Sequence, residues 1–564
     1  MKTSAKLAAL NSESAIRIVQ FVVGVIVIGL IFWWLQFSTP AICCGDFDGY
    51  YHVKWSRMLW ESIRNHSFPP AFPWLPLTTL NPKDYVDHHL LFHILQIPFT
   101  RLRDLRLGAK VGSTIFATLA VVSCYWLLVR YRIRYLLVWL IALLACSAPF
   151  LYRLNMTKAP PLTIIYLIVG IYLLFVKKYW PLALLALIFT LTYDMFVLLI
   201  VATAIWVIVI AWTERRLEWR PLVWVVLGTA AGLVINPYFP HNLYLFYEHL
   251  KIKLTASDFS TKVGSEWYPY DSWEFLGNSV VACVAMVVGY VAFDLGERKR
   301  SHYPLFFLLF STALLVMTAR WRRIAEYWPP FAVLFSAFSL QPWLEGTRSA
   351  FTRLPPDVLE ELRPFLDRDD DPIPPRETEQ QELTRTIAVA AVAVVLALAL
   401  FFNLRVTAKD IASSEPHEYY KAGADWMRAN IPPRQIVFNT DWDDFPRLFY
   451  YDETHYYVSG LDPTYLFDKN PDLSRLYERI TLGKEEDPGP LIRDRFGARY
   501  VFTDNVHHDF FTNAKESGWF EIVYEDPQCT IMHIRDEKAV PPAEKDEPDS
   551  DVPLDENNPA NSEP

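Results

Sequence analysis

The feature that most constrains this chain is a succession of long apolar runs separated by short polar gaps. A helix needs roughly 20 apolar residues to cross the hydrocarbon core of a bilayer. The run at 15–37 is long enough, and no small-residue cleavage site follows it, so we expect an anchor and not a signal peptide. The sequence predicts a mainly α, polytopic helical membrane domain with eleven candidate spans, at 15–37, 109–129, 134–150, 160–176, 180–193, 195–212, 221–237, 275–294, 303–319, 324–341 and 386–405.

Basic residues in the gaps between the runs predict the orientation of the chain. Lys2, Lys6 and Arg17 precede or begin the first run and place the N-terminus in the cytoplasm by the positive-inside rule. If there are eleven spans, the basic gaps all lie on the cytoplasmic side. They are at 130–134, 177–178, 214–220, 297–300 and 345–385. An odd number of spans places the C-terminal part outside. Because no endoplasmic reticulum retention signal is visible, we expect a bacterial inner-membrane protein with a periplasmic C-terminal domain.

Residues 88–107 complicate this topology, because they begin apolar, contain His88, His89 and His93, and end basic. A crossing here would invert every later assignment. We expect an interfacial helix on the outer side. The alternative is two additional crossings and thirteen spans in total.

The composition changes along the chain and predicts five parts. Residues 1–344 form the membrane domain with an outer loop at 38–107, and 345–385 form a Pro-rich, charged cytoplasmic loop. The last span follows at 386–405. Residues 406–536 are expected to form an outer α/β domain, with a helix at 419–430 and strands at 434–439 and 499–503. The acidic, Pro-rich tail at 537–564 has the composition of a disordered segment.

The distribution of charge also argues against two classes of function. Basic residues occur in short gaps and acidic residues concentrate toward the C-terminus, so a nucleic-acid partner is not expected. Few ionisable residues lie deep inside the predicted spans and no repeated halves are visible, which argues against a secondary transporter. The lipid bilayer is the one partner that composition alone implies.

The motif GDFDGYYH at 45–52 is the first candidate for chemistry, directly after the first span. Asp46 and Asp48 are two residues apart, so on an extended turn their carboxylates point to the same side. They can share a divalent cation, or divide into a base and a ligand. The structural alternative is a loop that is polar because it meets water.

Asp87, His88 and His89 form a second cluster, with His93 one helical turn after His89. Such a group can ligate a metal ion or hold a phosphate through charged imidazoles. The alternative is an amphipathic helix that uses histidines as its polar face.

Two later segments also carry more charge than anchoring requires. Glu266 lies among aromatic residues at 264–273, where a carboxylate needs a cationic or amide partner. Arg320, Arg322 and Arg323 lie at an outer membrane edge, against the positive-inside trend, and an anionic lipid phosphate or pyrophosphate explains them. The alternatives are an interfacial aromatic belt for the first segment, and pairing with Glu326 plus snorkelling for the second.

Together these motifs resemble the GT-C superfamily of membrane glycosyltransferases, and most nearly the catalytic subunit of oligosaccharyltransferase. The stretch DFDGYYH at 46–52 is similar to the first acidic motif of that family, and SEWYP at 265–269 is similar to its S-E-x-x-P stretch. The run 426–446 ends in TDWDDFP. Its W-D pair, Trp442 and Asp443, matches the core of the family's W-W-D-Y-G acceptor motif, while the following DFP departs from that motif. The second acidic motif falls near 152–162, where this chain has RLNMTKAP and no carboxylate.

The resemblance implies a membrane glycosyltransferase of the inverting type that takes a glycan from a polyprenyl phosphate or pyrophosphate donor to a protein or glycan acceptor. Asp46, Asp48 and Glu266 are the implied catalytic residues. Trp442, Asp443 and Asp444 are the implied acceptor-binding residues. Arg320, Arg322, Arg323 and Lys158 are candidates for the donor phosphate.

The missing second acidic motif leaves the cofactor open. Either Asp48 holds Mn or Mg together with Asp87 and His88, or Lys158 or Arg153 neutralises the phosphate without a metal. Three other functions also stay open. They are a polyprenyl-monophosphate-sugar transferase that modifies a lipid or cell-wall glycan, a flippase for lipid-linked sugars, and a sensor without catalytic activity.

Overall fold

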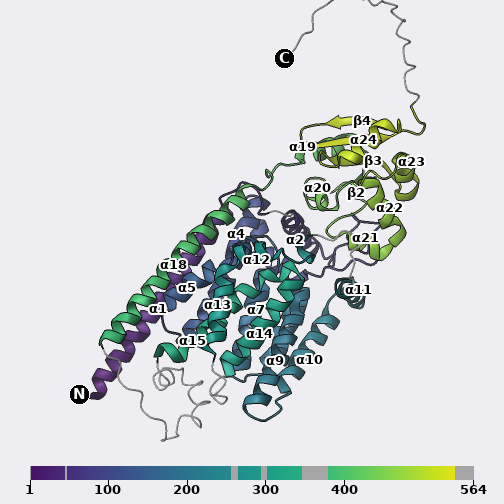
Figure 1. Ribbon diagram of the computed structural model, residues 1–564. Coiled ribbons are helices and arrows are strands. Elements are labelled where there is room, and N and C mark those ends of the chain that lie inside the picture. The colour runs from purple at the N-terminus through teal and green to yellow at the C-terminus, as the bar shows by residue number, and fades with distance from the viewer. Residues whose placement is uncertain (1, 45–46, 256–264, 294–301, 346–378, 540–564) are drawn as a thin grey trace, which may run out of the picture.

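The computed structural model describes residues 2–44, 47–255, 265–293, 302–345 and 379–539. A long bundle of helices carries a smaller C-terminal domain at one end (Figure 1). Residues 540–564 of the predicted tail, most of the loop at 345–385 and the position of Asp46 lie outside the described residues.

Long apolar stretches form the helices of the bundle, as their composition predicts. They are α1 (Lys2–Gln36), α4 (Leu105–Arg130), α5 (Leu136–Ala145), α6 (Ala148–Leu154), α7 (Pro160–Phe175), α8 (Pro181–Thr192), α9 (Val197–Thr213), α10 (Arg220–Ile235), α12 (Ser272–Asn278), α13 (Val280–Ala292), α14 (His302–Arg320), α15 (Trp328–Glu345) and α18 (Glu379–Ala412). Each predicted span coincides with a helix or with a bent pair of helices. The mainly helical membrane fold is therefore confirmed.

The lengths and hydropathy of the observed helices indicate fewer spans than the eleven predicted from the sequence pattern. In the described part of the chain, five helices are long and apolar enough to cross a membrane, and seven if two bent pairs each count as one span. The pairs bend by 81° between α5 and α6 and by 85° between α12 and α13. Three further apolar helices are shorter, namely α7, α8 and α10. The protein is an integral membrane protein, and the count of eleven stays a prediction.

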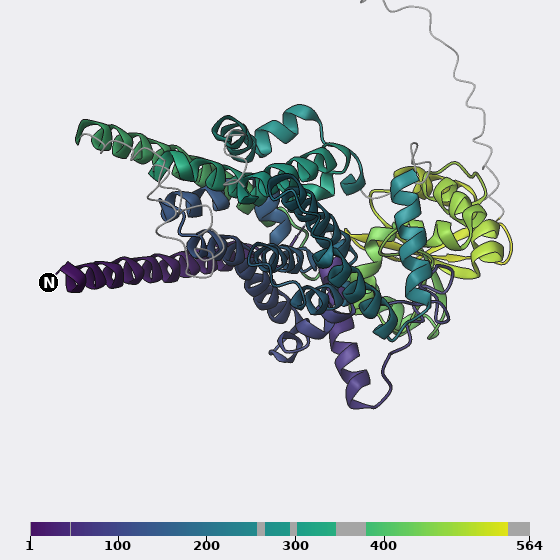
Figure 2. The ribbon, with the colours of Figure 1, turned by 90° about the horizontal axis from the view of Figure 1, so that it is seen from below.

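The last helix of the bundle, α18, packs against α5 and α6, and it projects beyond the remaining helices, as α1 does (Figure 2). It was expected to end at 405 but continues to Ala412. Its last turns carry Lys409 and Asp410, so polar residues alone did not end the helix. The C-terminal domain consequently begins after Ala412.

The segment at 88–107 does not form one helix. It holds α3 (Leu90–Gln96), the single turn η1 (Phe99–Arg101) and the start of α4. Seven residues are too few to cross a bilayer. His93 in α3 is fully buried, so this helix packs inside the protein and does not use its histidines as an exposed polar face.

Five further elements connect the bundle to the C-terminal domain or border the junction. They are α2 (Asp48–Arg64), α11 (His241–Thr255), the turns η2 (Asp194–Phe196) and η3 (Ser265–Trp267), and η4 (Arg322–Glu326). α2 packs against α3 and α4 on one side and against the C-terminal domain on the other.

A mixed five-stranded sheet in the order β2-β1-β3-β5-β4 forms the centre of the C-terminal domain. β1 pairs in parallel with β2 and β3, while β5 pairs antiparallel with β3 and β4. The predicted helix at 419–430 and both predicted strands are present. The elements are α19 (Lys421–Asn430), β1 (Ile436–Asn439), η5 (Trp442–Asp444), α20 (Phe445–Tyr451), β2 (Tyr456–Tyr457), α21 (Thr464–Lys469), α22 (Pro471–Thr481), α23 (Pro488–Leu491), η6 (Ile492–Phe496), β3 (Ala498–Asp504), α24 (His508–Glu516), β4 (Phe520–Glu525) and β5 (Cys529–Ile534).

One hydrophobic cluster is shared between α2, the loop that follows it and the C-terminal domain. Trp55 of α2 and Phe449 of α20 both belong to it. Polar contacts at the same junction join Lys54 to Glu453 at 2.5 Å, and the Trp74 indole donates to the Glu453 carbonyl at 2.8 Å. Packing of this kind holds the domain in a fixed place over the end of the bundle.

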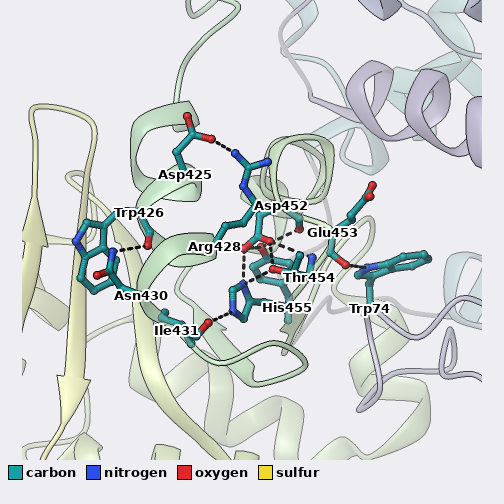
Figure 3. A network of polar contacts seen from close by, with 11 residues as sticks. Trp74, Asp425, Trp426, Arg428, Asn430, Ile431, Asp452, Glu453, Thr454 and His455 are labelled. Carbon is teal, nitrogen blue, oxygen red and sulfur yellow. Dashed lines mark hydrogen bonds and ion pairs between the residues drawn. The ribbon is translucent and has the colours of Figure 1, made fainter.

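Asp452 and His455 form a buried polar pair inside the C-terminal domain, close to Trp74 (Figure 3). The carboxylate accepts from His455 Nδ1 at 2.5 Å and from the Thr454 hydroxyl at 2.6 Å (the latter on its other oxygen), while His455 Nε2 lies 3.2 Å from the carbonyl of Ile431. Burial alone lowers the pKa of His455, but Asp452 more than offsets this and the pKa of His455 is raised. For Asp452, burial raises the pKa and the contacts with His455 and Thr454 outweigh it, so that pKa is lowered.

We expect Asp452→Ala to lower the melting temperature of the purified protein, because it leaves His455 buried without its charge partner. Breaking a buried pair costs about 3–5 kcal/mol. Because the pKa of His455 is raised, the pair stabilises the folded state fully below about pH 6.5. This stabilisation is lost as the pH rises through the pKa that His455 has in the folded protein. The loss on mutation should therefore be larger near pH 5.5 than near pH 9, measured by scanning fluorimetry.

Arg428→Ala is the matched control for this prediction. Arg428 pairs with Asp425 in the same region, but both side chains are nearly half exposed, so removal should cost only about 0–1 kcal/mol. An equal shift for the two variants would contradict the account.

Candidate functional site

A cavity of ≈ 270 Å³ lies where the end of the helix bundle meets the C-terminal domain. Its wall has a polar side and an apolar side. The polar and charged residues are Asp48, His52, His88, His89, Lys158, Tyr193, Asp194, Glu266, Arg323 and Asp462. The apolar and aromatic residues include Phe246, Trp267, Met317, Trp321, Ile324, Leu461 and Tyr465. The cavity therefore suits an amphiphile with a charged group and an apolar part.

Asp48 is the first residue of α2, and its carboxylate lies 2.9 Å from the Lys158 ammonium. Close packing between their two segments sets this distance. A Cβ atom added at Gly49 would lie 3.1 Å from Cβ of Thr157 and 2.9 Å from a methyl group of Ile42, so glycine lets the acidic motif approach the segment before α7. Thr157 in turn accepts from the Ser113 hydroxyl of α4 at 2.9 Å.

A second charged group combines two arginines with two glutamates at the other side of the cavity. Arg153 of α6 donates to Glu266 at 2.7 Å and also pairs with Glu326 of η4. Arg323 of η4 pairs with the other oxygen of Glu266 at 2.5 Å and donates to the Tyr193 hydroxyl. Its guanidinium also lies 5.2 Å from the ring centre of Trp267. Three distant segments of the chain are tied together by these contacts.

Glu266 stays ionised in this group. Burial alone raises the pKa of its carboxyl, but Arg323, Arg153 and Lys158 together more than offset burial and hold that pKa below its ordinary value. The carboxylate was predicted to be catalytic. Because both of its oxygens accept from guanidinium groups, it is better placed to hold Arg323 toward the cavity than to take up a proton.

Only one of the three predicted outer arginines lines the cavity, and it is Arg323. Arg322 instead lies over the Tyr270 ring at 4.5 Å and reaches Glu274 at 3.4 Å. Arg320 ends α14 and lies 5.9 Å from the ring centre of Trp321. The predicted pairing with Glu326 is made by Arg153 and not by these residues.

The residues predicted to hold a metal ion are not brought together as a set. Asp87 is fully buried and does not line the cavity; its oxygens accept from His93, Trp55 and the backbone N–H of His89. Asp48 is paired with Lys158, which lies in the segment where the resemblance placed the second acidic motif. Asp48 is the one carboxylate of the acidic motif that the structure describes, and the Lys158 ammonium is paired with it. This is a poor environment for Mn or Mg, which need several anionic oxygens.

A group that has metal-ligating side chains does occur in the described part of the C-terminal domain. Ligand atoms of Asp441, Asp504 and His507 lie within 4.8 Å of one another. Asp504 accepts from His507 Nδ1 at 2.5 Å, so the group already has an internal hydrogen bond.

The residues predicted to bind the acceptor, Trp442, Asp443 and Asp444, form the turn η5 and do not line the cavity. Asp444 is buried, and burial beside Asp441 and Asp504 raises its pKa. The C-terminal domain instead reaches the cavity through Leu461, Asp462 and Tyr465, which follow β2.

Sequence reasoning missed these three residues, and also Tyr193 and Asp194. Tyr193 and Asp194 lie where the predicted span at 180–193 ends and the span at 195–212 begins, so their position between two spans was the signal for them. Leu461, Asp462 and Tyr465 carry no such signal, because only the packing of the domain brings them to the cavity.

Comparisons with known proteins were consistent with this architecture. The profile of the TgpA N-terminal domain matches residues 180–404, which is less than half of the chain. No curated protein matches the sequence. Similar folds do occur among solved structures, and three of them share 13–15% sequence identity with this chain.

The archaeal oligosaccharyltransferase AglB from Archaeoglobus fulgidus, in complex with an inhibitory peptide and a dolichol-phosphate, has a TM-score of 0.57 at 13% identity over 95% of this chain and 75% of its own. ArnT from Cupriavidus metallidurans, bound to undecaprenyl phosphate, has a TM-score of 0.51 at 13% identity over 93% and 99%. The arabinofuranosyltransferase AftD from Mycobacteria has a TM-score of 0.52 at 15% identity over 91% and 40%. The chain therefore has the GT-C fold, and the resemblance predicted from the motifs is confirmed for the fold.

We expect Glu266→Gln to loosen the segments that the arginines tie together. Removing one partner of a buried ion pair leaves uncompensated charge, at a cost of about 3–5 kcal/mol. Each 1.4 kcal/mol is about tenfold in an equilibrium, so backbone amides of η3 and η4 should exchange with deuterium at least about tenfold faster, measured by hydrogen exchange and mass spectrometry.

Glu274→Gln is the control, because Glu274 is exposed and its ion pair with Arg322 is long, at 3.4 Å, and therefore weak. It should leave the exchange of η4 nearly unchanged. Unchanged exchange in the Glu266 variant as well would show that the arginine group does not hold these segments.

Proposed function

We propose that this protein is a glycosyltransferase that moves a sugar from a polyprenyl phosphate-linked donor to an acceptor at the outer face of the membrane. The observation that carries the proposal is the cavity itself. It combines the cations Lys158 and Arg323 with Asp48 and an apolar wall at the end of a helix bundle of GT-C fold. A lipid-linked sugar phosphate has matching parts, namely an anionic phosphate, a polar sugar and an apolar tail.

Lys158 and Arg323 are the residues that we assign to the donor phosphate. During transfer the bond between the anomeric carbon and the phosphate oxygen breaks, and the phosphate gains one negative charge. Cations fixed in a partly desolvated cavity stabilise that developing charge more than water does. Both side chains are mostly buried and held by carboxylates, so they are in place before the donor arrives.

Asp48 and Asp46 are proposed to face the anomeric centre and the incoming acceptor, and attack from the side opposite the phosphate inverts that centre. Asp46 lies outside the described residues, so its assignment follows from the sequence motif alone. Glu266 is proposed to hold Arg323 in position. This role replaces the catalytic role that the family resemblance implied for Glu266.

A divalent cation is not part of this proposal, because the donor set does not fit one. Lys158 neutralises Asp48 at 2.9 Å, and Asp87 is engaged away from the cavity. The ammonium supplies positive charge where the sequence resemblance had placed Mn or Mg. This choice is the metal-free alternative left open by the missing second acidic motif.

A specific observation favours the monophosphate type of donor over a pyrophosphate-linked oligosaccharide. The two cations that line the cavity are already paired with carboxylates, so little net positive charge faces the ligand. A pyrophosphate carries more negative charge than a monophosphate diester. The cavity of ≈ 270 Å³ is also slightly below the range of about 300–1,000 Å³ that is typical of drug-sized ligands, and it suits one sugar.

The acceptor is proposed to enter between the bundle and the C-terminal domain, beside Asp462 and Tyr465. A protein or a glycan hydroxyl is compatible with these polar side chains. The predicted orientation, with the N-terminus in the cytoplasm and this domain in the periplasm of a bacterial inner membrane, would place the reaction at the outer face.

We expect Lys158→Met to lower the turnover of a labelled polyprenyl-phosphate sugar in reconstituted membranes by about 10²–10³-fold, the usual effect of losing one electrostatic stabiliser of a transition state. Lys177→Met is the matched control. Lys177 forms a similar half-buried pair with Glu214 beyond the other end of α7, away from the cavity, and its loss should leave turnover within a few-fold of wild type.

Two further outcomes would contradict the proposal. Loss of activity on chelation, restored by Mn or Mg, would show that a metal does the work assigned to Lys158. Movement of the labelled donor across the membrane without its consumption would identify a flippase.

A further inference from the structure

A chain of three buried side chains leads from the interior of the protein to the cavity wall. The Asp87 carboxylate lies 2.8 Å from His93 Nδ1, and His93 Nε2 lies 2.8 Å from His52 Nδ1. Asp87, His93 and His52 are 1%, 0% and 4% exposed. His52 also lines the cavity, one helical turn after Asp48.

With both imidazole rings neutral, the hydrogen bonds of this chain fix which nitrogen of each ring carries a proton. Asp87 is ionised: burial raises its pKa, but His93 and Trp55 outweigh burial and the pKa of Asp87 is lowered. It also accepts from the Trp55 indole and the His89 backbone, both at 3.0 Å, so it acts only as an acceptor. His93 must then donate through Nδ1, which leaves its Nε2 as an acceptor. His52 donates to it through Nδ1, and His52 Nε2 keeps its lone pair.

The lone pair of His52 is not used elsewhere in the described part of the chain, where His93 is the only hydrogen-bond partner of the His52 ring. The charged and titratable groups that face His52 are Asp48 on its own helix, His93 on α3, His88 and His89 on the preceding loop, and Lys158 before α7. Burial, followed by His93, Lys158 and His88, keeps the pKa of His52 well below its ordinary value. The ring is therefore neutral near pH 7.

We propose that His52 Nε2 accepts the proton of the acceptor hydroxyl during sugar transfer, and that Asp87 and His93 are positioning residues that fix its tautomer. The inference rests on the proposed function, because it names the base for the same reaction. It also narrows the acceptor to a hydroxyl group. Asp48, held by Lys158, is left to orient that hydroxyl.

The step balances without a further reagent. The acceptor oxygen forms a bond to the anomeric carbon while the bond from that carbon to the phosphate oxygen breaks, and the leaving polyprenyl phosphate keeps the electron pair. The hydroxyl proton moves to His52 Nε2. The imidazolium that forms is stabilised through His93 by the Asp87 carboxylate, and it releases the proton to water when the product leaves.

Asp87→Asn and His52→Gln test the inference. The matched controls lie outside the cavity: Asp84→Asn, whose carboxylate pairs with Lys469 at the surface, and His533→Gln in β5. An asparagine at 87 offers its oxygen to Trp55 and His89 and its N–H to His93. This reverses the hydrogen bonds and places a proton on His52 Nε2. Both test variants should lower kcat by about 10²–10⁴-fold with little change in the KM for the donor, as expected for loss of a general base.

The pH profile separates a base from a merely structural residue. In wild type, kcat should be level from about pH 6 upward and fall only in acid, because the lowered pKa of His52 keeps its base form present until the pH drops through that value. The acid limb should be absent in His52→Gln, and raising the pH should not rescue Asp87→Asn. Exchange of the histidine C2 hydrogens, followed by mass spectrometry, measures the pKa of His52 without an activity assay and should place it below the ordinary histidine value of about 6.5.

Three results would overturn the inference while leaving the proposed function intact: near-normal kcat in both test variants, an unchanged acid limb in His52→Gln, or a pKa of His52 at or above its ordinary value. Absence of transfer by the wild-type protein would instead contradict the proposed function. If Asp87→Asn fails to fold, His52→Gln and the exchange measurement still decide the question.

Discussion

The ion pair between Lys158 and Asp48 is the contact on which the site depends. It joins the start of α2 to the segment between α6 and α7, and the absence of a side chain at Gly49 lets these segments meet. The pair fixes a carboxylate and an ammonium at one side of the cavity. The opposite side is set by Glu266, which holds Arg323 against Tyr193. Positive charge from Lys158 and Arg323 is therefore available to a phosphate between the two groups without a bound metal ion.

The C-terminal domain completes the cavity. Its contacts with α2 and the loop after it are both apolar and polar, and they bring Asp462 and Tyr465 to the wall. Arg447 of α20 reinforces this junction, since its buried guanidinium lies 4.0 Å from the ring centre of Phe47, next to Asp48. A shift of the domain would therefore disturb the acidic motif directly. The position of the motif and that of the domain are parts of one arrangement.

Sequence patterns predicted much of this molecule, because the bilayer and the sheet impose simple rules. Apolar runs located the helices, and the turn and strand signals located β1 and β3. The motif residues Asp48, Glu266 and Arg323 do line the cavity. Lys158 was considered because two expected carboxylates were missing, and its pairing with Asp48 gives that absence a physical reason.

Other residues could not be placed from the sequence. Arg320 and Arg322 lie within three positions of Arg323, yet the backbone direction of η4 turns only Arg323 toward the cavity. The histidines after Asp87 suggested a metal site or a polar helix face. Only the packing of α2 against α3 shows that His93 joins Asp87 to His52. Leu461, Asp462 and Tyr465 have no local signal, since long-range docking brings them to the site.

We propose that the cavity holds a polyprenyl phosphate between Lys158 and Arg323. The most direct test is cryo-electron microscopy of the purified protein in lipid nanodiscs with added polyprenyl phosphate. We expect density for the phosphate within hydrogen-bond distance of both cations, with the lipid tail along the apolar wall that contains Phe246, Met317 and Trp321. Phosphate density at a different place, with this cavity empty at saturating lipid, would contradict it.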